Sequence, residues 1–299
     1  MNKQIYVNGQ RLRTPREKTR DHKVTLNIFT VIYFIYAATL LFPFLWLIYN
    51  SLKDKFEFGL NPWMAPKAPL KMLSNYTKIF SEFNLGAMFF NSVILATAMP
   101  FINLFFCLCT AYAYAMHDFK GKKALYAVAM IPMVVNIVGT LPAQYSLYAK
   151  LHVIDNIPML LLTCTGGVGF AFMLFAGVLE NVSRSYKEAA EIDGAGPWRI
   201  FLQIYAPQIA TVFGAQWLLG FIGNWNEYMM FYLYLPSHQT LSVGINKISE
   251  QVMLGFSQFS GDYPKLFAAM LLSVVPVVLL FYLFQNKIMR FSMGGGLKG

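Results

Sequence analysis

Residues Ser185–Pro207 read SYKEAAEIDGAGPWRIFLQIYAP, a polar and sharply punctuated stretch between two long apolar runs. Ser185 and Glu188 have the spacing of a capping box, in which the serine side chain caps an early helical amide. Gly194 is placed to end this helix, because glycine tolerates the left-handed conformation of a helix C-terminus. Pro197 suits the first turn of a second helix, where its missing amide costs no hydrogen bond. The stretch therefore predicts two short helices joined by a tight turn.

The remainder of the chain is far more apolar than this stretch. Of the 299 residues 57% are hydrophobic and only 13% are charged, whereas about 25% of the residues in a soluble domain are charged. A helix needs about 20 apolar residues to cross a bilayer. Six stretches qualify, namely 24–50, 87–116, 124–146, 157–179, 208–235 and 266–286, and Glu227 is the only acidic or basic residue in any of them. The sequence predicts an all-α integral membrane protein with six transmembrane helices.

The distribution of basic residues predicts how these helices are oriented. If the N-terminus is cytoplasmic, sixteen of the 24 Lys and Arg residues fall on the cytoplasmic side, seven of them in residues 1–23. Because cytoplasmic segments are enriched in Lys and Arg, both termini and the stretch Ser185–Pro207 are expected to face the cytoplasm. The segment 51–86 runs against this bias, since it carries five lysines and is expected to face outward. The arm 1–23 is expected to be a basic, solvated tail attracted to anionic lipid.

Other chemistries find little support in the sequence. The three cysteines lie in apolar runs, and the four histidines are scattered without metal-ligand spacing. The run Gly166–Gly169 lacks the Lys and Ser or Thr of a phosphate-binding loop, so close helix packing explains it better. The short hairpin is nearly neutral, which disfavours DNA binding. We therefore expect no catalytic site, no metal, no cofactor and no nucleic-acid partner.

A family resemblance adds to this local reading, which by itself leaves an interfacial linker open. The motif Glu188-Ala189-Ala190, followed by Gly194 and by Ile204-x-Ala206-Pro207, resembles the EAA loop of ATP-binding-cassette (ABC) importer permeases. The surrounding EAAEIDGAGPWRIF is similar to the carbohydrate-importer branch, especially to relatives of the smaller maltose permease subunit. Ala206 stands where that family usually has Leu. The likeness covers roughly residues 25–299.

The resemblance implies a type I ABC importer permease fold for residues 24–290, between the arm 1–23 and a cytoplasmic tail 291–299. The EAA loop 181–207 would hold the coupling helix, which docks on a cytosolic ATPase. The implied partners are a second permease subunit, two copies of the ATP-binding subunit, an extracytoplasmic solute-binding protein and membrane lipid. The chain would be a multi-pass component of a bacterial inner membrane and not itself an enzyme. The residues expected to couple are Glu188, Ala189, Ala190, Asp193 and Gly194.

A second candidate site lies in the fifth apolar stretch. Asn224, Trp225, Asn226 and Glu227 form an unusually polar cluster for lipid depth, so they are expected to face a cavity or a partner subunit. They either hydrogen-bond and stack against a sugar in the translocation path or hold two permeases together. Two other functions stay open here, an ion-gradient-driven secondary transporter that uses the isolated Glu227 and an importer permease for a solute other than sugar.

Overall fold

The computed structural model describes the backbone of residues 5–294, except for 8–9, 13–14, 135–138 and 255–259. Two three-residue strands, β1 (Ile5–Val7) and β2 (Gln10–Leu12), pair antiparallel near the N-terminus. The remaining regular structure in the described residues is helical, which confirms the all-α class apart from this small hairpin. Part of the expected arm 1–23 already belongs to the first helix, because α1 spans Pro15–Ser51.

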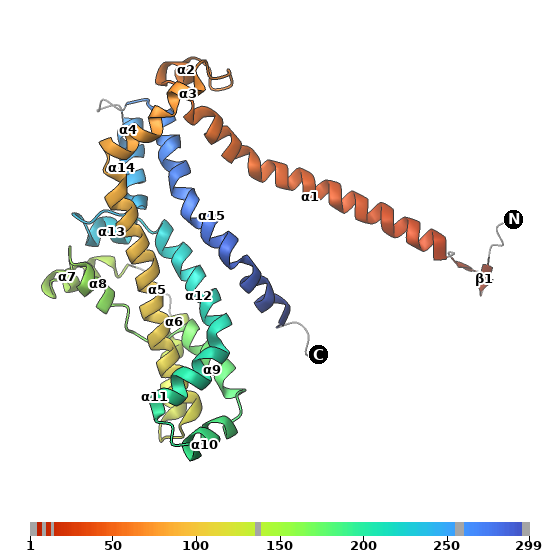
Figure 1. Cartoon of the computed structure of the whole chain (residues 1–299), viewed down its shortest axis with the longest axis vertical. Helices are drawn as coiled ribbons and strands as arrows, with labels where there is room; N and C mark the ends of the chain where they lie inside the picture. Colours follow the sequence, from red (N-terminus) through yellow and green to blue (C-terminus); the bar gives the residue numbers. More distant parts are fainter. Residues whose placement is uncertain (1–4, 8–9, 13–14, 135–138, 255–259, 295–299) are drawn as a thin grey trace.

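Three helices of the described chain are long and apolar enough to cross a membrane. They are α1, whose apolar part is Leu26–Ser51, α5 (Leu85–Met116), and α15 (Tyr263–Gly294), whose apolar part is Tyr263–Phe284. They correspond to the first, second and sixth predicted spans. Helix α1 leaves the other helices and projects to one side (Figure 1). No residue of its most apolar window is buried, whereas Asn50 and Ser51 at its end are, so most of this helix presents its surface to lipid or to another subunit.

Each of the three other predicted spans consists of two shorter helices. The third span holds α6 (Lys122–Val134) and α7 (Leu141–Lys150), and the fourth holds α8 (Ile157–Leu162) and α9 (Phe170–Glu180). The fifth holds α12 (Ala206–Asn226) and α13 (Met229–Tyr234). Non-helical backbone is tolerated at membrane depth where protein groups satisfy it.

The break between α8 and α9 shows how this is achieved. Gly167 and Gly169 have φ angles of +62° and +96°, which favour glycine and end the helical path. The side chains of Asn103 and Thr110 on α5 donate hydrogen bonds to the carbonyl oxygens of Cys164 and Gly167. A Cβ on Gly167 would lie 3.2 Å from the backbone of α5. Gly167 therefore does permit close packing, as predicted, but at a helix break and not within a continuous helix, whereas a Cβ on Gly166 or Gly169 would meet open space.

The packed core lies where α5 meets α9 and α12. Its largest buried side chains include Phe172, Phe175 and Leu179 on α9, which contact the small residues of α5 and the start of α12. Helix α12 approaches α5 very closely, because a Cβ on Gly220 would lie 2.6 Å from Cβ of Pro100. This contact fixes α12 against the centre of the bundle.

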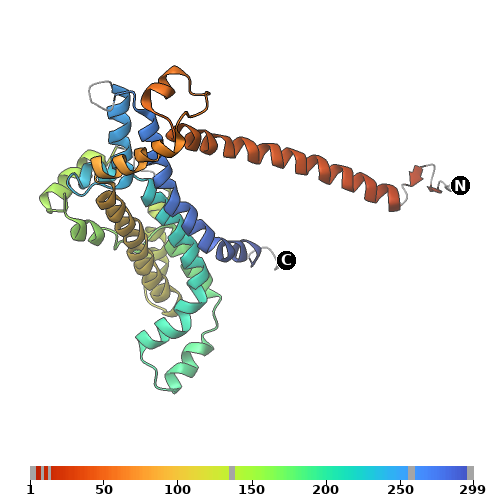
Figure 2. The same ribbon diagram turned by 45° about the horizontal axis from the view of Figure 1, so that its top comes forward.

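The short helices gather at the two ends of the bundle. At one end lie α10 (Ser185–Ile192) and α11 (Pro197–Ile200), followed by the π-helical turn η1 (Phe201–Tyr205). At the other end lie α2 (Lys55–Leu60), α3 (Pro69–Met72), α4 (Ser74–Glu82) and α14 (Leu241–Leu254). Figures 1 and 2 show these groups on opposite ends, joined by α5 and α12.

Candidate coupling hairpin and solute path

The turn of the hairpin is built as the sequence predicts. Helix α10 ends at Ile192, and Gly194 has a φ angle of +76°. The Ala195 amide donates to the Ala190 carbonyl at 2.9 Å, and the Gly194 amide donates to the Glu191 carbonyl at 3.1 Å. This pair of hydrogen bonds is a Schellman motif, which satisfies the last carbonyls of a helix. Pro197 is the first residue of α11, also as predicted.

The predicted capping box at the start of α10 is wrong. Ser185 lies inside the helix, and no side-chain capping hydrogen bond is made at Arg184, the residue before it. Instead Ser183 Oγ accepts a hydrogen bond from the Ser185 amide at 3.3 Å. A capping oxygen ordinarily accepts from an amide two or three residues ahead. The cap therefore comes from Ser183, two residues before the serine that the spacing suggested.

Two contacts attach the hairpin to the bundle. Arg184 donates to Asp118, in the loop after α5, with Nη1 and Oδ2 2.9 Å apart, and these hydrogen bonds hold the pKa of Asp118 below its usual range. On the other side, the ring centroid of Tyr112 on α5 lies 5.0 Å from that of Phe201 and 5.2 Å from that of Tyr205. Sequence reasoning missed both contacts, because their partners lie far apart in the chain.

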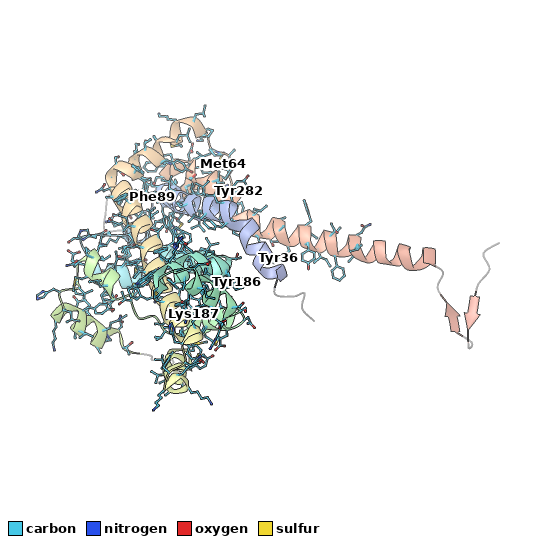
Figure 3. All side chains as sticks on the ribbon, turned by 60° about the horizontal axis from the view of Figure 1, so that its bottom comes forward. Tyr36, Met64, Phe89, Tyr186, Lys187 and Tyr282 are labelled. Atoms are coloured by element: carbon cyan, nitrogen blue, oxygen red, sulfur yellow. The ribbon has the colours of Figure 1, made fainter. Side chains whose placement is uncertain are left out.

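The outer face of the hairpin is exposed. Glu188, Ala189, Asp193 and Gly194 are exposed, whereas Ala190 is half-buried and packs toward the core. Beside Glu188, Lys187 pairs with Glu191 at 3.7 Å, and Figure 3 marks Lys187 and Tyr186 in this region. Three large apolar side chains are also exposed, Ile192 at 87%, Trp198 at 69% and Tyr186 at 57%. The hairpin thus presents a mixed apolar and acidic surface at the end of the molecule.

The polar cluster of the fifth span lies at the end of α12. Glu227 ends this helix, and its Oε1 accepts a hydrogen bond from the Met230 amide at 2.9 Å, which caps the next helix, α13. The Glu227 carbonyl accepts from Ser242 Oγ on α14 at 2.6 Å. Asn224 is half-buried. These two residues of the predicted site are not among those that line the cavity described below.

Trp225 is buried, with only 4% of its surface exposed. Phe221 stacks on its ring with centroids 5.6 Å apart, and Phe89 meets it edge-on at 5.9 Å. Its indole nitrogen donates to the Ser273 carbonyl on α15 at 3.1 Å. The side chain therefore packs between helices while it also contributes to the wall of a cavity.

This cavity has a volume of about 310 Å³ and lies between the end of α12, α14 and α15. Hydroxyl, amide and aromatic groups dominate its wall. Asn226 is exposed, and its amide donates to the Ile222 carbonyl at 2.8 Å; Asn246 donates to Glu250 at 3.1 Å. The lining residues are Trp225, Asn226, Tyr228, Ser242, Ile245, Asn246, Ser249, Met270 and Ser273. The structure thus brings two of the four predicted path residues to one neutral, polar cavity.

Two loops are joined by hydrogen bonds at the end of α13. The Asp155 amide donates to the Tyr234 carbonyl at 2.7 Å, and its carboxylate accepts from the Ser237 amide at 2.9 Å. His238 Nδ1 lies 3.2 Å from the same carboxylate oxygen. The hydrogen bonds from Ser237 hold the pKa of Asp155 below its usual range. These contacts join the loop after α7 to the loop before α14.

A helical membrane subunit with broken apolar spans and a short polar hairpin at one end of the bundle is typical of a transport permease. Residues 23–290 match the family described as "Binding-protein-dependent transport system inner membrane component", and the chain belongs to this family. It is therefore a multi-pass inner-membrane transport component without enzymatic activity of its own. Proteins of this family operate with a second permease subunit, an ATP-hydrolysing subunit and a solute-binding protein.

Relatives and a solved structure agree with this assignment. The arabinooligosaccharide transport permease AraQ of Bacillus subtilis is 27% identical over 276 residues, covering 90% of this chain and 95% of the relative. The maltose/maltodextrin transport permease MalG of Vibrio vulnificus is 31% identical over 219 residues, covering 70% and 71%. A bacterial ABC transporter that imports the acidic polysaccharide alginate matches with a TM-score of 0.75, 20% identity and coverage of 89% and 97%. The last match confirms the type I importer permease fold.

Proposed function

We propose that this permease forms half of the translocation path for a sugar or oligosaccharide and couples it to ATP hydrolysis through the hairpin α10–α11. The observation that carries the solute class is the neutral cavity at the end of α12. Its hydroxyl and amide groups offer both donors and acceptors, as sugar hydroxyls require. The names of AraQ and MalG, which refer to arabinooligosaccharides and to maltose or maltodextrin, support the same class.

The cavity suits one or two sugar rings in size and chemistry. Ligand pockets of about 300–1,000 Å³ are usual for small molecules, and this cavity lies at the lower end of that range at about 310 Å³. Asn226 and Asn246 supply amides, and Ser242 and Ser249 supply hydroxyls. A secondary transporter would use Glu227 as an ion-binding carboxylate, yet this side chain caps α13. The geometry therefore favours recognition of a neutral solute over ion coupling.

Replacing Asn226 by Ala tests the solute path against a purely structural role. Asn181 is a matched control, because it is also exposed, also ends a helix, and also donates its side-chain amide to the carbonyl four residues earlier, at 2.7 Å. We expect Asn226→Ala to lower sugar uptake or change its selectivity in proteoliposomes while assembly and ATP hydrolysis persist. Asn181→Ala should leave uptake unchanged. Loss of assembly with Asn226→Ala, or equal uptake in both variants, would contradict the proposed path.

The exposed face of the hairpin supports docking on the ATPase. Glu188 offers a charge to a basic partner and Ala189 permits close approach, while the half-buried Ala190 seats α10 on the bundle and the Gly194 turn fixes the angle between the two helices. Ile192, which is 87% exposed, offers an apolar side chain that such docking would cover. Asp193 directly follows α10, lies beside the turn and is exposed.

This role requires that the hairpin and both termini face the cytoplasm. The excess of Lys and Arg on that side supports the orientation. A cysteine at Thr77, in α4, is expected to react with a membrane-impermeant thiol reagent added to intact cells, whereas a cysteine at Lys122 is not. The reverse labelling pattern would contradict the proposed orientation.

A further inference from the structure

Residues 52–73, between α1 and α4, form a small structure that we call the outer cap. It contains α2 and α3 and four of the five lysines that run against the charge bias of the chain. The cap lies at the end of the bundle opposite the coupling hairpin, beside the point where α1 leaves the other helices (Figures 1 and 2). Neither the translocation path nor the coupling function explains why this segment is rich in lysine.

The fold uses one of these lysines internally. Lys53 is 1% exposed, and its Nζ donates to the Pro62 carbonyl at 2.5 Å. The same nitrogen lies 4.4 Å from the centre of the Tyr49 ring, a cation–π contact. The Asn75 amide donates to the carbonyls of Ser51 and Lys53 at 2.9 and 3.0 Å. Lys53 therefore folds the cap back onto the end of α1 and adds no charge to the surface.

Aromatic contacts place the cap level with the outer ends of two membrane-spanning helices. The ring centroid of Trp63 lies 6.3 Å from that of Trp46 and 6.4 Å from that of Phe42, and both of these residues are on α1. The Phe58 ring lies 5.4 Å from Tyr263 and 5.4 Å from Phe267, in the first two turns of α15. Rings clustered at the ends of spanning helices are typical of the boundary between hydrocarbon and headgroups. The cap thus lies at this boundary and not above it in water.

The exposed side chains of the cap are mainly apolar and basic, beside the exposed acidic residue Asp54. Six large apolar side chains are more than half exposed: Phe56 (75%), Leu60 (81%), Trp63 (68%), Met64 (58%), Leu70 (84%) and Leu73 (51%). Lys67 and Lys71 are exposed among them. Figure 3 marks Met64 near the region where α1 and α15 meet. A patch of this kind is unusual on a surface that faces water, and through Trp63 it adjoins the largely exposed apolar surface of α1.

We propose that the outer cap is an interfacial anchor that lies in the headgroup layer of the membrane and binds anionic phospholipid. Its apolar side chains enter the boundary of the acyl chains, and Lys67 and Lys71 bind lipid phosphates, as in amphipathic segments that lie on a membrane. The continuity with α1 and the positive charge favour a lipid surface over a protein partner. The anchor would hold the outer end of α1 at a fixed depth. Only its assignment to the outer leaflet rests on the proposed orientation.

The depth of Met64 tests this proposal in the assembled transporter. An environment-sensitive fluorophore is attached to Met64→Cys, in a background where the three native cysteines are replaced and uptake is retained. Thr77→Cys, on the exposed face of α4, is the matched control. The complexes are reconstituted in vesicles of phosphatidylcholine and phosphatidylglycerol, with brominated lipid as one quencher and iodide as the other. We expect lipid to quench the label at residue 64 strongly and iodide to quench it weakly, with the opposite pattern at residue 77.

Charge recognition is tested in the same vesicles. Brominated phosphatidylglycerol should quench the label at residue 64 more than brominated phosphatidylcholine does, and Lys67→Gln with Lys71→Gln should reduce that ratio to one. Each lysine near an anionic surface favours binding about five-fold. Iodide quenching at residue 64 equal to that at residue 77 would overturn the proposal, because the cap would then face water. Protection from both quenchers, with or without added solute-binding protein, would overturn it in favour of a protein partner.

Discussion

Replacing Gly194 by Ala isolates the conformational requirement of the coupling hairpin. The residue has a φ angle of +76°, and a Cβ built on it meets no atom within 4 Å. The substitution therefore changes no packing contact in the free subunit and acts only through the backbone. An L-residue in the left-handed region costs about 1–2 kcal/mol relative to glycine. A change of this size shifts the equilibrium between the formed and opened turn about 5–30-fold toward the opened form.

Gly196, two residues further on, is the control for this change. A Cβ on Gly196 also meets open space, but its φ angle is −70° with ψ 161°, which any residue before a proline adopts readily. Gly196→Ala is therefore expected to be neutral or to stabilise the loop by about 0.4–1 kcal/mol, through the unfolded state. The two variants differ only in the backbone region that the alanine must occupy.

Two measurements check the prediction. Hydrogen exchange at the Ala195 amide, which closes the Schellman motif, should accelerate in Gly194→Ala and not in Gly196→Ala. Sugar uptake per ATP hydrolysed should fall in the same variant, because an opened turn no longer transmits the movement of the ATPase. Equal exchange and equal uptake in the two variants would refute the reasoning. Faster exchange without loss of uptake would show that the turn is formed as described but is not required for coupling.

Three further changes test other parts of the structure. Glu188→Lys should abolish transport while the protein still inserts, because it reverses the charge offered to the ATPase; Glu180→Lys, at the C-terminus of α9 where a cation is favoured, should retain transport. Gly220→Ala should destabilise the complex by about 1–3 kcal/mol, because its Cβ overlaps α5. A Cβ on Gly223 meets open space, so Gly223→Ala should raise the melting temperature slightly. Equal melting temperatures of the two variants would contradict this packing. Asp155 has a lowered pKa, so the loop pairing it makes should persist above pH ~4 and be lost as the pH falls through the lowered value. Hydrogen exchange of the two loops should therefore become faster as the pH falls, and Asp155→Asn should remove this dependence on pH.

The features that the sequence predicted correctly are governed by local rules. Gly194 and Pro197 define the turn because left-handed backbone and the first turn of a helix each favour one residue type. The class of the protein follows from the length of apolar runs, because a bilayer leaves few other structures that satisfy the backbone. The predicted cap of α10 is wrong because two serines compete for the position. Ser183 and Ser185 are both acceptable capping residues, and a motif two residues out of register cannot be distinguished by spacing alone.

The features that the sequence did not predict depend on tertiary contacts. The run Gly166–Gly169 was interpreted as close helix packing, and hydropathy alone does not show that the span breaks there, because Asn103 and Thr110 on another helix satisfy the break. The exposure of Ile192 also cannot be predicted from the sequence, since an apolar residue at the end of a helix is usually expected to belong to a core. The fifth-span cluster was recognised as polar, yet Trp225 and Asn226 line the cavity, Glu227 caps α13, and Asn224 does neither. Only the three-dimensional arrangement makes that division.

In the proposed function, α12 is the element that connects the two candidate sites. Its 21 residues follow α11 and η1 directly, so the chain is helical from the coupling hairpin to Asn226, and α12 alone covers about 30 Å at 1.5 Å per residue. The close contact of Gly220 with α5 prevents α12 from bending freely. At its far end, Glu227 joins α12 to both α13 and α14 through its carboxylate and its carbonyl. In the proposed function, a movement of the hairpin reaches the cavity through η1 and α12, and the helix break at Glu227 is the point where that movement would open or close the cavity wall.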